Sequence, residues 1–214
     1  MPKLRILLAD DHLLVLEGFR RILEGQYELV GTVEDGRALL GAAKELQPDI
    51  VILDISMPLL NGIDAAAQLK KICPSAKIII VTMHADTEYV RSAFEAGATA
   101  YVLKRSAADE LEQAIRMAVT GHSYITPLIT KDMLNVFLSK SSEPSAETHT
   151  LTMRQREVLQ LLTEGRTAKE IANLLKVSSR TIEFHKSQIL TRLKLHTTAD
   201  LIKYALTHGI MGIS

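Results

Sequence analysis

Three carboxylates, a hydroxyl and an amine are the side chains whose types and spacing could carry chemistry in this 214-residue chain. Each follows or ends an apolar, β-type run, and they are Asp10, Asp11, Asp54, Thr82 and Lys104. Carboxylates brought within a few ångströms repel by about 4 kcal/mol per close pair at an effective dielectric of roughly 20, and a hard divalent cation such as Mg²⁺ removes that repulsion. A carboxylate beside a cation and an ammonium group can attack a phosphoryl group. The set therefore predicts phosphoryl transfer to a carboxylate.

Asp54 is the best placed nucleophile of this set. It stands alone after the apolar run 50–53, and a tight turn at Asn61 and Gly62 follows, which we expect to leave it exposed. Any single Asp at a strand end is more often a turn or capping residue, and Lys104 or Thr82 alone would be unremarkable surface and strand residues. Because all five residues occupy the carboxyl ends of predicted strands, we expect them to share one pocket.

The elements that must position these residues are strands alternating with helices. Short β-type runs lie at residues 4–9, 27–33, 50–53, 77–82 and 99–103, and the segments between them carry apolar residues at helical spacing. Five such units indicate an α/β fold with a doubly wound, five-stranded parallel sheet of the flavodoxin-like type. In such sheets ligands bind beyond the carboxyl ends of the strands.

A small helical domain is predicted to follow. Residues 139–150 (SKSSEPSAETHT) have the composition of a solvated linker. Beyond them, capping-box patterns begin helices at Thr152 and Thr167, and further helices are expected to begin at Ser178 or Ser179 and at Thr197 or Thr198. The predicted boundaries are an α/β domain over 1–122, a connecting helix and flexible linker over 123–150, and an all-α domain over 151–214.

Charge and cysteine content narrow the class of protein. The net charge of zero divides into −5 for residues 1–148, with 15 Lys and Arg against 20 Asp and Glu, and +5 for residues 149–214. A basic second half suggests a polyanionic partner. The single Cys73 excludes an intramolecular disulfide and a four-thiolate zinc site, and no apolar run approaches the roughly 18 residues that span a bilayer. We expect a cytoplasmic protein that does not associate with membranes.

Residues 179–193 have the pattern of a helix that enters the major groove of DNA. On a helical wheel the apolar face holds Ile182, Ile189 and Leu193. The opposite face and its flanks hold Arg180, Glu183, Phe184, Ser187, Gln188 and Thr191. Phe184 would suit a thymine methyl, and Glu183 would accept from cytosine N4 or pair with a neighbouring cation. The side chains placed to reach phosphates are Arg180, His185, Lys186 and Arg192. A protein-interaction helix with Phe184 as its anchor fits the same periodicity.

The first domain resembles the receiver domain of bacterial two-component response regulators over about residues 1–120. The resemblance rests on the identity and spacing of Asp10, Asp11, Asp54, Met57, Pro58, Asn61, Gly62, Thr82, Tyr101 and Lys104. It implies that Asp54 accepts a phosphoryl group from a sensor histidine kinase. It also implies a Mg²⁺ site formed by Asp11, Asp54 and the backbone carbonyl of Ser56, with Asp10 assisting.

The same resemblance implies a switch. Thr82 would hydrogen-bond the phosphoryl group, Lys104 would pair with it, and Tyr101 would turn inward as Thr82 moves. Packing of Tyr101 on the sheet without a switching role fits the composition equally well. Many receiver domains carry Pro after the Lys, often with a cis bond, whereas Arg105 follows Lys104 here and leaves the geometry of that loop open.

The second domain resembles the LuxR-type helix-turn-helix, so that the whole chain is similar to the NarL/FixJ family of response regulators. The matching residues are 151–159, 169–172, Gly165, Val177, Ser178, Thr181, Ile182, His185 and Leu193. The resemblance implies base reading by Glu183, Phe184 and Ser187. Family members often carry Lys or Val at the first two positions, which implies a distinct operator. The last helix resembles a dimerisation helix through Leu201, Ile202 and Ala205, although these residues also fit a domain core.

The leading hypothesis is a phosphorylation-controlled transcription factor rather than an enzyme. Phosphorylation would favour a homodimer and release the basic domain for duplex DNA, with RNA polymerase as a further partner. A metal-dependent phosphatase is the enzymatic alternative, but Ser56 stands where such an enzyme needs an acid/base Asp two residues after Asp54. An RNA-binding or protein-scaffolding output domain is the third. His12 and His84 show no metal-ligand spacing and are interpreted as ordinary residues.

Overall fold

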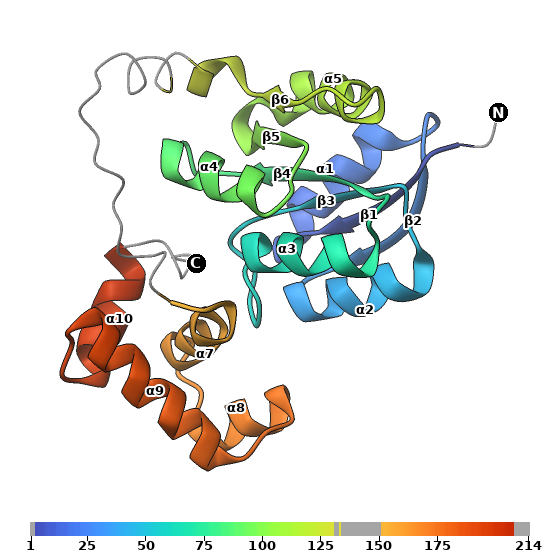
Figure 1. Ribbon diagram of the computed structural model, residues 1–214. Coiled ribbons are helices and arrows are strands. Elements are labelled where there is room, and N and C mark those ends of the chain that lie inside the picture. The colour runs from blue at the N-terminus through green and yellow to red at the C-terminus, as the bar shows by residue number, and fades with distance from the viewer. Residues whose placement is uncertain (1–2, 131–132, 134–150, 208–214) are drawn as a thin grey trace. The chain divides into compact units, whose positions relative to one another are not determined.

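The computed structural model describes residues 3–130, 133 and 151–207 (Figure 1). The chain forms two compact units, Met1–Ser141 and Ser142–Ser214. The predicted linker at 139–150 lies outside the described residues, and so does most of the predicted connecting helix. Among the described residues, no helix is both long and apolar enough to cross a membrane.

A six-stranded parallel sheet organises the first unit, with the strand order β2-β1-β3-β4-β5-β6. The strands are β1 (Arg5–Ala9), β2 (Glu28–Val33), β3 (Ile50–Leu53), β4 (Lys77–Thr82), β5 (Ala100–Leu103) and β6 (Tyr124–Ile125). The first five are the predicted strands, each within one residue at either end. The doubly wound α/β fold is therefore confirmed, but the sheet has six strands rather than five.

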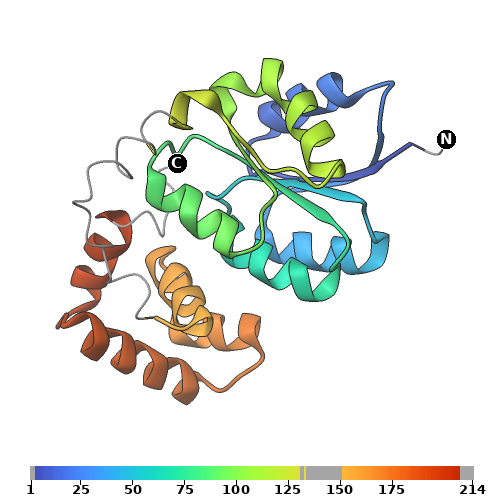
Figure 2. The same ribbon diagram turned by 45° about the horizontal axis from the view of Figure 1, so that its top comes forward.

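Helices cover both faces of this sheet (Figures 1 and 2). One face packs against α1 (Leu13–Leu23) and α5 (Ala107–Val119). The other packs against α2 (Gly36–Leu46), α3 (Gly62–Ile72) and α4 (Thr87–Glu95). Since both faces are covered, the central strands are apolar throughout rather than alternating, which is how the sequence presents them.

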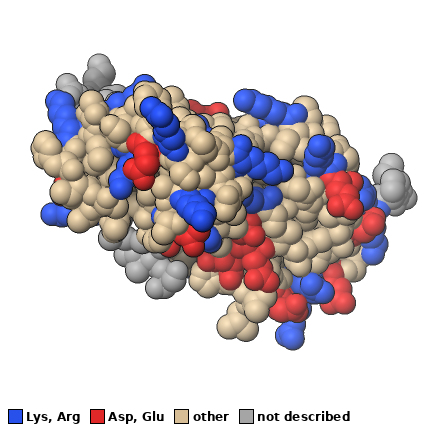
Figure 3. Space-filling model, turned by 90° about the horizontal axis from the view of Figure 1, so that it is seen from below, with Lys and Arg blue, Asp and Glu red and all other residues tan. Residues whose placement is uncertain are grey.

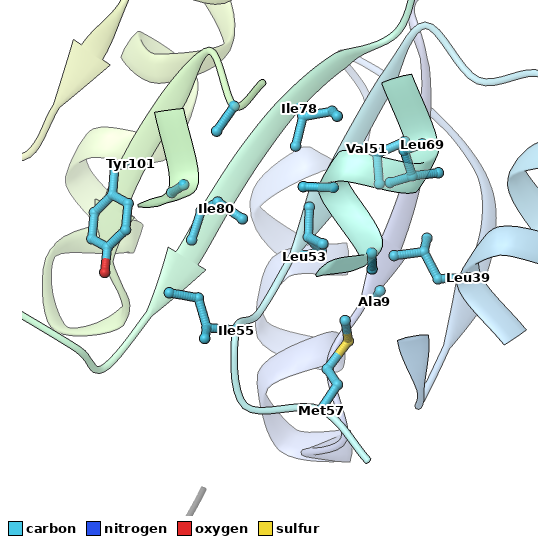
Figure 4. Close-up of a cluster of buried hydrophobic side chains, with 14 of the residues drawn as sticks. Ala9, Leu39, Val51, Leu53, Ile55, Met57, Leu69, Ile78, Ile80 and Tyr101 are labelled. Carbon is cyan, nitrogen blue, oxygen red and sulfur yellow. The ribbon is translucent and has the colours of Figure 1, made fainter. Parts of the chain in front are cut away.

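Alternate residues of each strand contribute to two separate cores. In β1, Ile6 belongs to the core under α1 and α5, whereas Leu7 belongs to the core under α2, α3 and α4. Figure 4 shows part of this second core, where Tyr101 of β5 lies beside Ile80 of β4 and Leu53 lies further along the sheet. The side chains of all these residues are buried to within 1% of full burial. Two full cores hold the strand ends, and the polar residues there, in fixed positions.

The sixth strand, β6, consists of two residues that pair with β5. Tyr124 and Ile125 lie opposite Ala100 and Tyr101, and the main chain continues the contact when the N–H of Thr126 donates to the carbonyl of Tyr101 at 3.0 Å. A two-residue strand leaves too short an apolar run to be recognised in the sequence. It lies in the segment 123–150 that was predicted to be a connecting helix and linker.

Over residues 151–207, the described part of the second unit, the chain forms four helices: α7 (Met153–Thr163), α8 (Ala168–Leu175), α9 (Ser179–Leu193) and α10 (Thr198–Thr207). Their starts agree with the sequence signals. Thr152 and Thr167 each close a capping box with the residue three positions on, and the Ser178 side chain accepts the Thr181 N–H at 3.1 Å. Gly165, between α7 and α8, has a φ of 80°, a conformation that favours glycine.

Candidate functional site

The sheet order brings the polar strand ends together. Strands β1, β3, β4 and β5 are consecutive neighbours, so the residues at their carboxyl ends meet at one edge. The Lys104 Nζ lies 2.7 Å from Asp10 Oδ2 and 2.8 Å from Asp54 Oδ2. Of the five residues expected to share one pocket, the structure brings Asp10, Asp54 and Lys104 into direct contact.

Burial makes the electrostatics of this pocket strong. Asp10 and Asp54 expose only 1% and 3% of their surface, so the expectation that the turn leaves Asp54 exposed is wrong. Burial raises the pKa of Asp10, although the ammonium of Lys104 and the His12 N–H partly offset the effect. Burial alone would lower the pKa of Lys104, but the carboxylates of Asp54 and Asp10 outweigh it and raise the pKa. Lys104 thus stays charged at neutral pH and compensates the two buried carboxylates.

Asp54 is held by the main chain on both sides. Its own N–H donates to the Ala9 carbonyl at 3.0 Å, and its Oδ1 accepts the Ile55 N–H at 2.6 Å. Gly62 packs so tightly on the turn that a Cβ there would lie 2.0 Å from the Asp54 carbonyl oxygen. Asn61 caps α3 by accepting the Asp64 N–H at 2.9 Å. The Asn-Gly pair therefore serves close packing and helix capping, which fixes the position of Asp54.

Carboxylate oxygens suited to a cation gather beside Lys104. One ligand atom each from Asp10, Asp11, His12 and Asp54 lie within 4.8 Å of one another. Oxygen-rich groups of this kind match the preference of Mg²⁺. His12 was interpreted as an ordinary residue, yet its Nδ1 lies 2.7 Å from Asp11 Oδ1 and 3.2 Å from Asp10 Oδ1. Its position directly after two Asp residues was the signal in the sequence.

The loop after β4 connects the predicted switch residues. The Tyr101 hydroxyl donates to the His84 carbonyl at 2.9 Å, and the His84 N–H lies 3.5 Å from Thr82 Oγ1. Tyr101 and Thr82 are fully buried, so the structure holds Tyr101 in its inward position. The His84 ring stacks on Tyr89 with centroids 4.2 Å apart. A movement of Thr82 would therefore be felt at Tyr101 through the main chain of His84.

His84 also spans the mouth of the pocket. Its Nε2 lies 2.9 Å from the Ser56 Oγ, which links the loop after β4 to the loop after β3. Burial lowers the pKa of His84, so the imidazole is neutral at physiological pH. Neither its spacing nor its surroundings in the sequence marked this residue. Only the adjacency of β3 and β4 brings it to Ser56.

Helix α9 has the buried and exposed faces that the sequence predicts. Ile182 and Ile189 are fully buried, whereas Phe184 exposes 57% of its surface, unusual for a large apolar side chain. The other exposed members of the predicted face are Arg180, Glu183, Ser187, Thr191 and Arg192. His185 and Lys186 are half-buried. The roles assigned to these residues on DNA stay predictions.

Arg192, one of the basic side chains assigned to phosphate contacts, is hydrogen-bonded within the second unit. The Arg192 Nη1 donates to Gln155 Oε1 at 3.1 Å, and Gln155 in turn donates to Gln188 Oε1 at 3.0 Å. This network ties α9 to the start of α7.

Figure 3 shows Lys and Arg side chains spread over the face in view, with Asp and Glu gathered in a few groups.

Two of the three predicted dimerisation residues lie inside the second unit. Leu201 and Ala205 are fully buried, and their helix α10 packs against α7. Their side chains are part of the interior of this unit, and their role in dimerisation stays a prediction. Ile202 is half-buried and is the member of the three that retains exposed surface. An apolar helical pattern does not separate a domain core from an interface, which is why the sequence left both readings open.

Comparison with known proteins agrees with this geometry. The sequence matches the response regulator receiver domain over residues 6–116 and the bacterial regulatory proteins of the luxR family over residues 149–205. The chain belongs to the NarL/FixJ family of response regulators. Members of this family are DNA-binding transcriptional regulators, phosphorylation by a kinase is general among them, and their receiver domains generally bind Mg²⁺ at the acidic pocket.

One relative and two solved structures of another protein illustrate this family membership. The transcriptional regulatory protein MctR of Rhizobium johnstonii is 36% identical over 213 residues, which cover 99% of this chain and 97% of MctR. RcsB from Salmonella enterica serovar Typhimurium, bound to a promoter with phosphomimetic BeF3⁻, has a TM-score of 0.60 at 27% identity and covers 94% of this chain and 97% of its own. A structure of two RcsB dimers bound to two parallel DNAs has a TM-score of 0.59 at 28% identity, over 96% and 98%.

Proposed function

We propose that this response regulator is switched by phosphorylation of Asp54 and then binds specific duplex DNA as a homodimer to regulate transcription. The observation that carries the proposal is the placement of the Lys104 ammonium within 2.8 Å of both Asp10 and Asp54 at the carboxyl edge of the sheet. A buried carboxylate paired with a fixed cation is what an acyl-phosphate acceptor requires.

The transfer step uses Asp54 as nucleophile. A carboxylate oxygen of Asp54 attacks the phosphorus of a histidine kinase's phosphohistidine; the new P–O bond forms as the P–N bond breaks. The electron pair stays on the donor imidazole, which takes a proton from solvent. Lys104 stays paired with Asp10 at 2.7 Å and supplies positive charge beside the arriving phosphoryl oxygens.

A divalent cation completes the proposed pocket. Its ligands would be Asp11, Asp54 and the Ser56 backbone carbonyl, with Asp10 assisting. The grouping of Asp10, Asp11 and Asp54 ligand atoms within 4.8 Å supports this assignment, because such carboxylates repel without a cation. Bound Mg²⁺ would neutralise charge on the phosphoryl oxygens.

The proposed switch starts at Thr82. Phosphorylation adds a bulky, strongly accepting group, and the Thr82 hydroxyl is the donor that would turn toward it. The Tyr101 hydroxyl, bonded to the His84 carbonyl, would follow that loop. The expected result is a changed surface at α4 and β5 that favours the homodimer and frees the DNA-binding unit. These events, and contact with RNA polymerase, would take place in the cytoplasm.

DNA recognition is assigned to α9. Glu183, Phe184 and Ser187 would contact bases, with Phe184 as the exposed apolar group against a thymine methyl. The phosphate contacts are assigned to Arg180, His185, Lys186 and Arg192. That RcsB has been seen bound to a promoter and as dimers on DNA supports this part of the proposal.

One experiment tests the switch. The protein is incubated with Mg²⁺ and acetyl phosphate, and intact mass and duplex binding are measured, with sites first selected from random duplexes. Wild type should gain one phosphoryl group and bind tightly, with affinity that falls steeply with salt. Asp54→Asn should gain none. Asp49→Asn is the matched control, because Asp49 lies at the opposite end of β3 and bonds the Arg5 N–H.

Two results would overturn this proposal. Wild type that takes up no phosphoryl group at Asp54 would remove the phosphoacceptor role. DNA affinity that ignores the adduct would remove the switch. Sustained release of phosphate from small phosphomonoesters would instead favour the phosphatase, and preference for RNA over duplex DNA would favour the RNA-binding alternative.

A further inference from the structure

Thr126, the residue after β6, is fully buried and uses both functions of its hydroxyl. Its Oγ1 accepts the N–H of Leu103 at 3.0 Å and donates to Glu110 Oε2 at 2.8 Å. Leu103 is the last residue of β5, and Glu110 lies in the first turn of α5. One hydroxyl therefore joins the two elements on either side of Lys104.

The backbone explains why a side chain is needed at this point. The ladder between β5 and β6 pairs only Ala100 and Tyr101, after which the Thr126 N–H reaches the Tyr101 carbonyl at 3.0 Å. The next donor of β5 on this side is the Leu103 N–H. No backbone carbonyl of the two-residue strand extends that far, so the Thr126 hydroxyl takes its place.

The loop that carries Lys104 has little rigidity of its own. Lys104–Ser106 form a single 3₁₀ turn, a poorly bonded conformation, and no peptide bond among the described residues is cis. Arg105, which follows Lys104, places no restriction on the backbone. Yet the amine must reach Asp10 and Asp54 to within 2.8 Å at the same time. The restraint on the loop therefore comes from its ends.

We propose that Thr126 and Glu110 are positioning residues for the phosphoryl-transfer pocket, which fix the Lys104 ammonium by bracing both ends of its loop. The Glu110 carboxylate also lies near Tyr124: burial and this carboxylate raise the pKa of Tyr124 to about 12. Thr126 acts on the reaction only through Lys104. The inference rests on the proposed function of Asp54 and adds residues to the same site.

The test compares rates of Asp54 phosphorylation by acetyl phosphate with Mg²⁺, measured by intact mass on folded protein at low temperature. Thr126→Val keeps the shape and removes the hydroxyl, and it should slow the reaction about threefold to tenfold, the loss expected for one hydrogen bond. Thr126→Ser should restore the rate. Thr99→Val is the matched control, because the Thr99 hydroxyl donates to the Ile78 carbonyl at 2.8 Å at the other end of β5.

A double-mutant cycle separates positioning from general stability. In a Lys104→Ala background, Thr126→Val should produce no further slowing, whereas its effect on the thermal midpoint should persist. If Thr126→Val does not fold, Glu110→Ala takes its place with the same expectations. An unchanged rate in the single variant, or equal slowing with and without Lys104, would overturn this inference alone. A wild type without any adduct would overturn the proposed function and this inference together.

Discussion

Replacing Lys104 with Met removes the ammonium group that lies 2.7 Å from Asp10 and 2.8 Å from Asp54. Met has a similar length and apolar stem, so the change removes charge more than volume. The two carboxylates expose 1% and 3% of their surface and lose the cation that compensates them. Breaking a buried pair by removal of one partner costs about 3–5 kcal/mol, and we expect a loss of that size in the free energy of unfolding.

The loss should depend on pH with a defined sign. The pKa of Asp10 is already raised by burial, and removal of Lys104 raises it further. When the pKa of a group is higher in the folded state than in the unfolded state, its protonation stabilises the folded state. That stabilisation is complete below the unfolded-state pKa and is lost as the pH rises through the folded-state pKa. The variant should therefore approach wild type as the pH falls from 7.5 toward 5. A saturating divalent cation, at about 100 times its Kd, should return about 2.7 kcal/mol.

Urea unfolding of both proteins at pH 7.5 and pH 5.5, with and without Mg²⁺, measures these differences. Arg105→Met is the control, because it removes the neighbouring exposed cation and should change stability by less than about 0.5 kcal/mol. A loss for Lys104→Met no larger than that of the control would contradict the reasoning. So would a difference from wild type that grows on acidification.

Three further predictions concern other residues of the two units. Asp10→Asn should raise the metal-free free energy of unfolding at pH 7.5, because burial raises the pKa of Asp10 and its ionisation opposes folding; urea midpoints that fall would refute this. Gly62→Ala places a Cβ 2.0 Å from a carbonyl oxygen, so it should lower the free energy of unfolding by about 1–3 kcal/mol and slow the labelling of Asp54 by acetyl phosphate. Gly41→Ala is the control, because nothing lies within 4 Å of its Cβ, and it should not lower the midpoint of thermal unfolding. Phe184→Ala should relax discrimination at one base position by about 1–3 kcal/mol, while Lys186→Ala should weaken all duplexes alike; equal effects in a titration of variant sites would contradict the groove assignment.

The positions of the pocket residues could be predicted because parallel strands impose them. An apolar run such as 50–53 ends at a defined residue, and the polar group after it must lie at the carboxyl edge. The capping boxes at Thr152 and Thr167 were equally predictable, since each depends on two residues three positions apart. Local chemistry therefore determined both the element starts and the site.

What the sequence did not show depends on contacts between distant segments. Strand β6 forms only because two residues meet the edge of β5, and Thr126 gains its importance from that pairing. His84 reaches Ser56 across 28 positions of the chain. Leu201 has the same helical periodicity whether it packs inside or on a partner, and only the folded helix α10 shows that it lies inside.

The pairing of β6 with β5 has a consequence for anyone who wishes to produce the first unit alone. A fragment that stops at residue 122 would lack Tyr124, Ile125 and Thr126, and would leave main-chain groups of Thr99, Tyr101 and Leu103 open along one side. An exposed edge strand of this kind can pair with a strand of another molecule, so the fragment would tend to aggregate. A fragment of the first unit should therefore extend through at least Thr130, so that β6 and Thr126 cover the edge of β5.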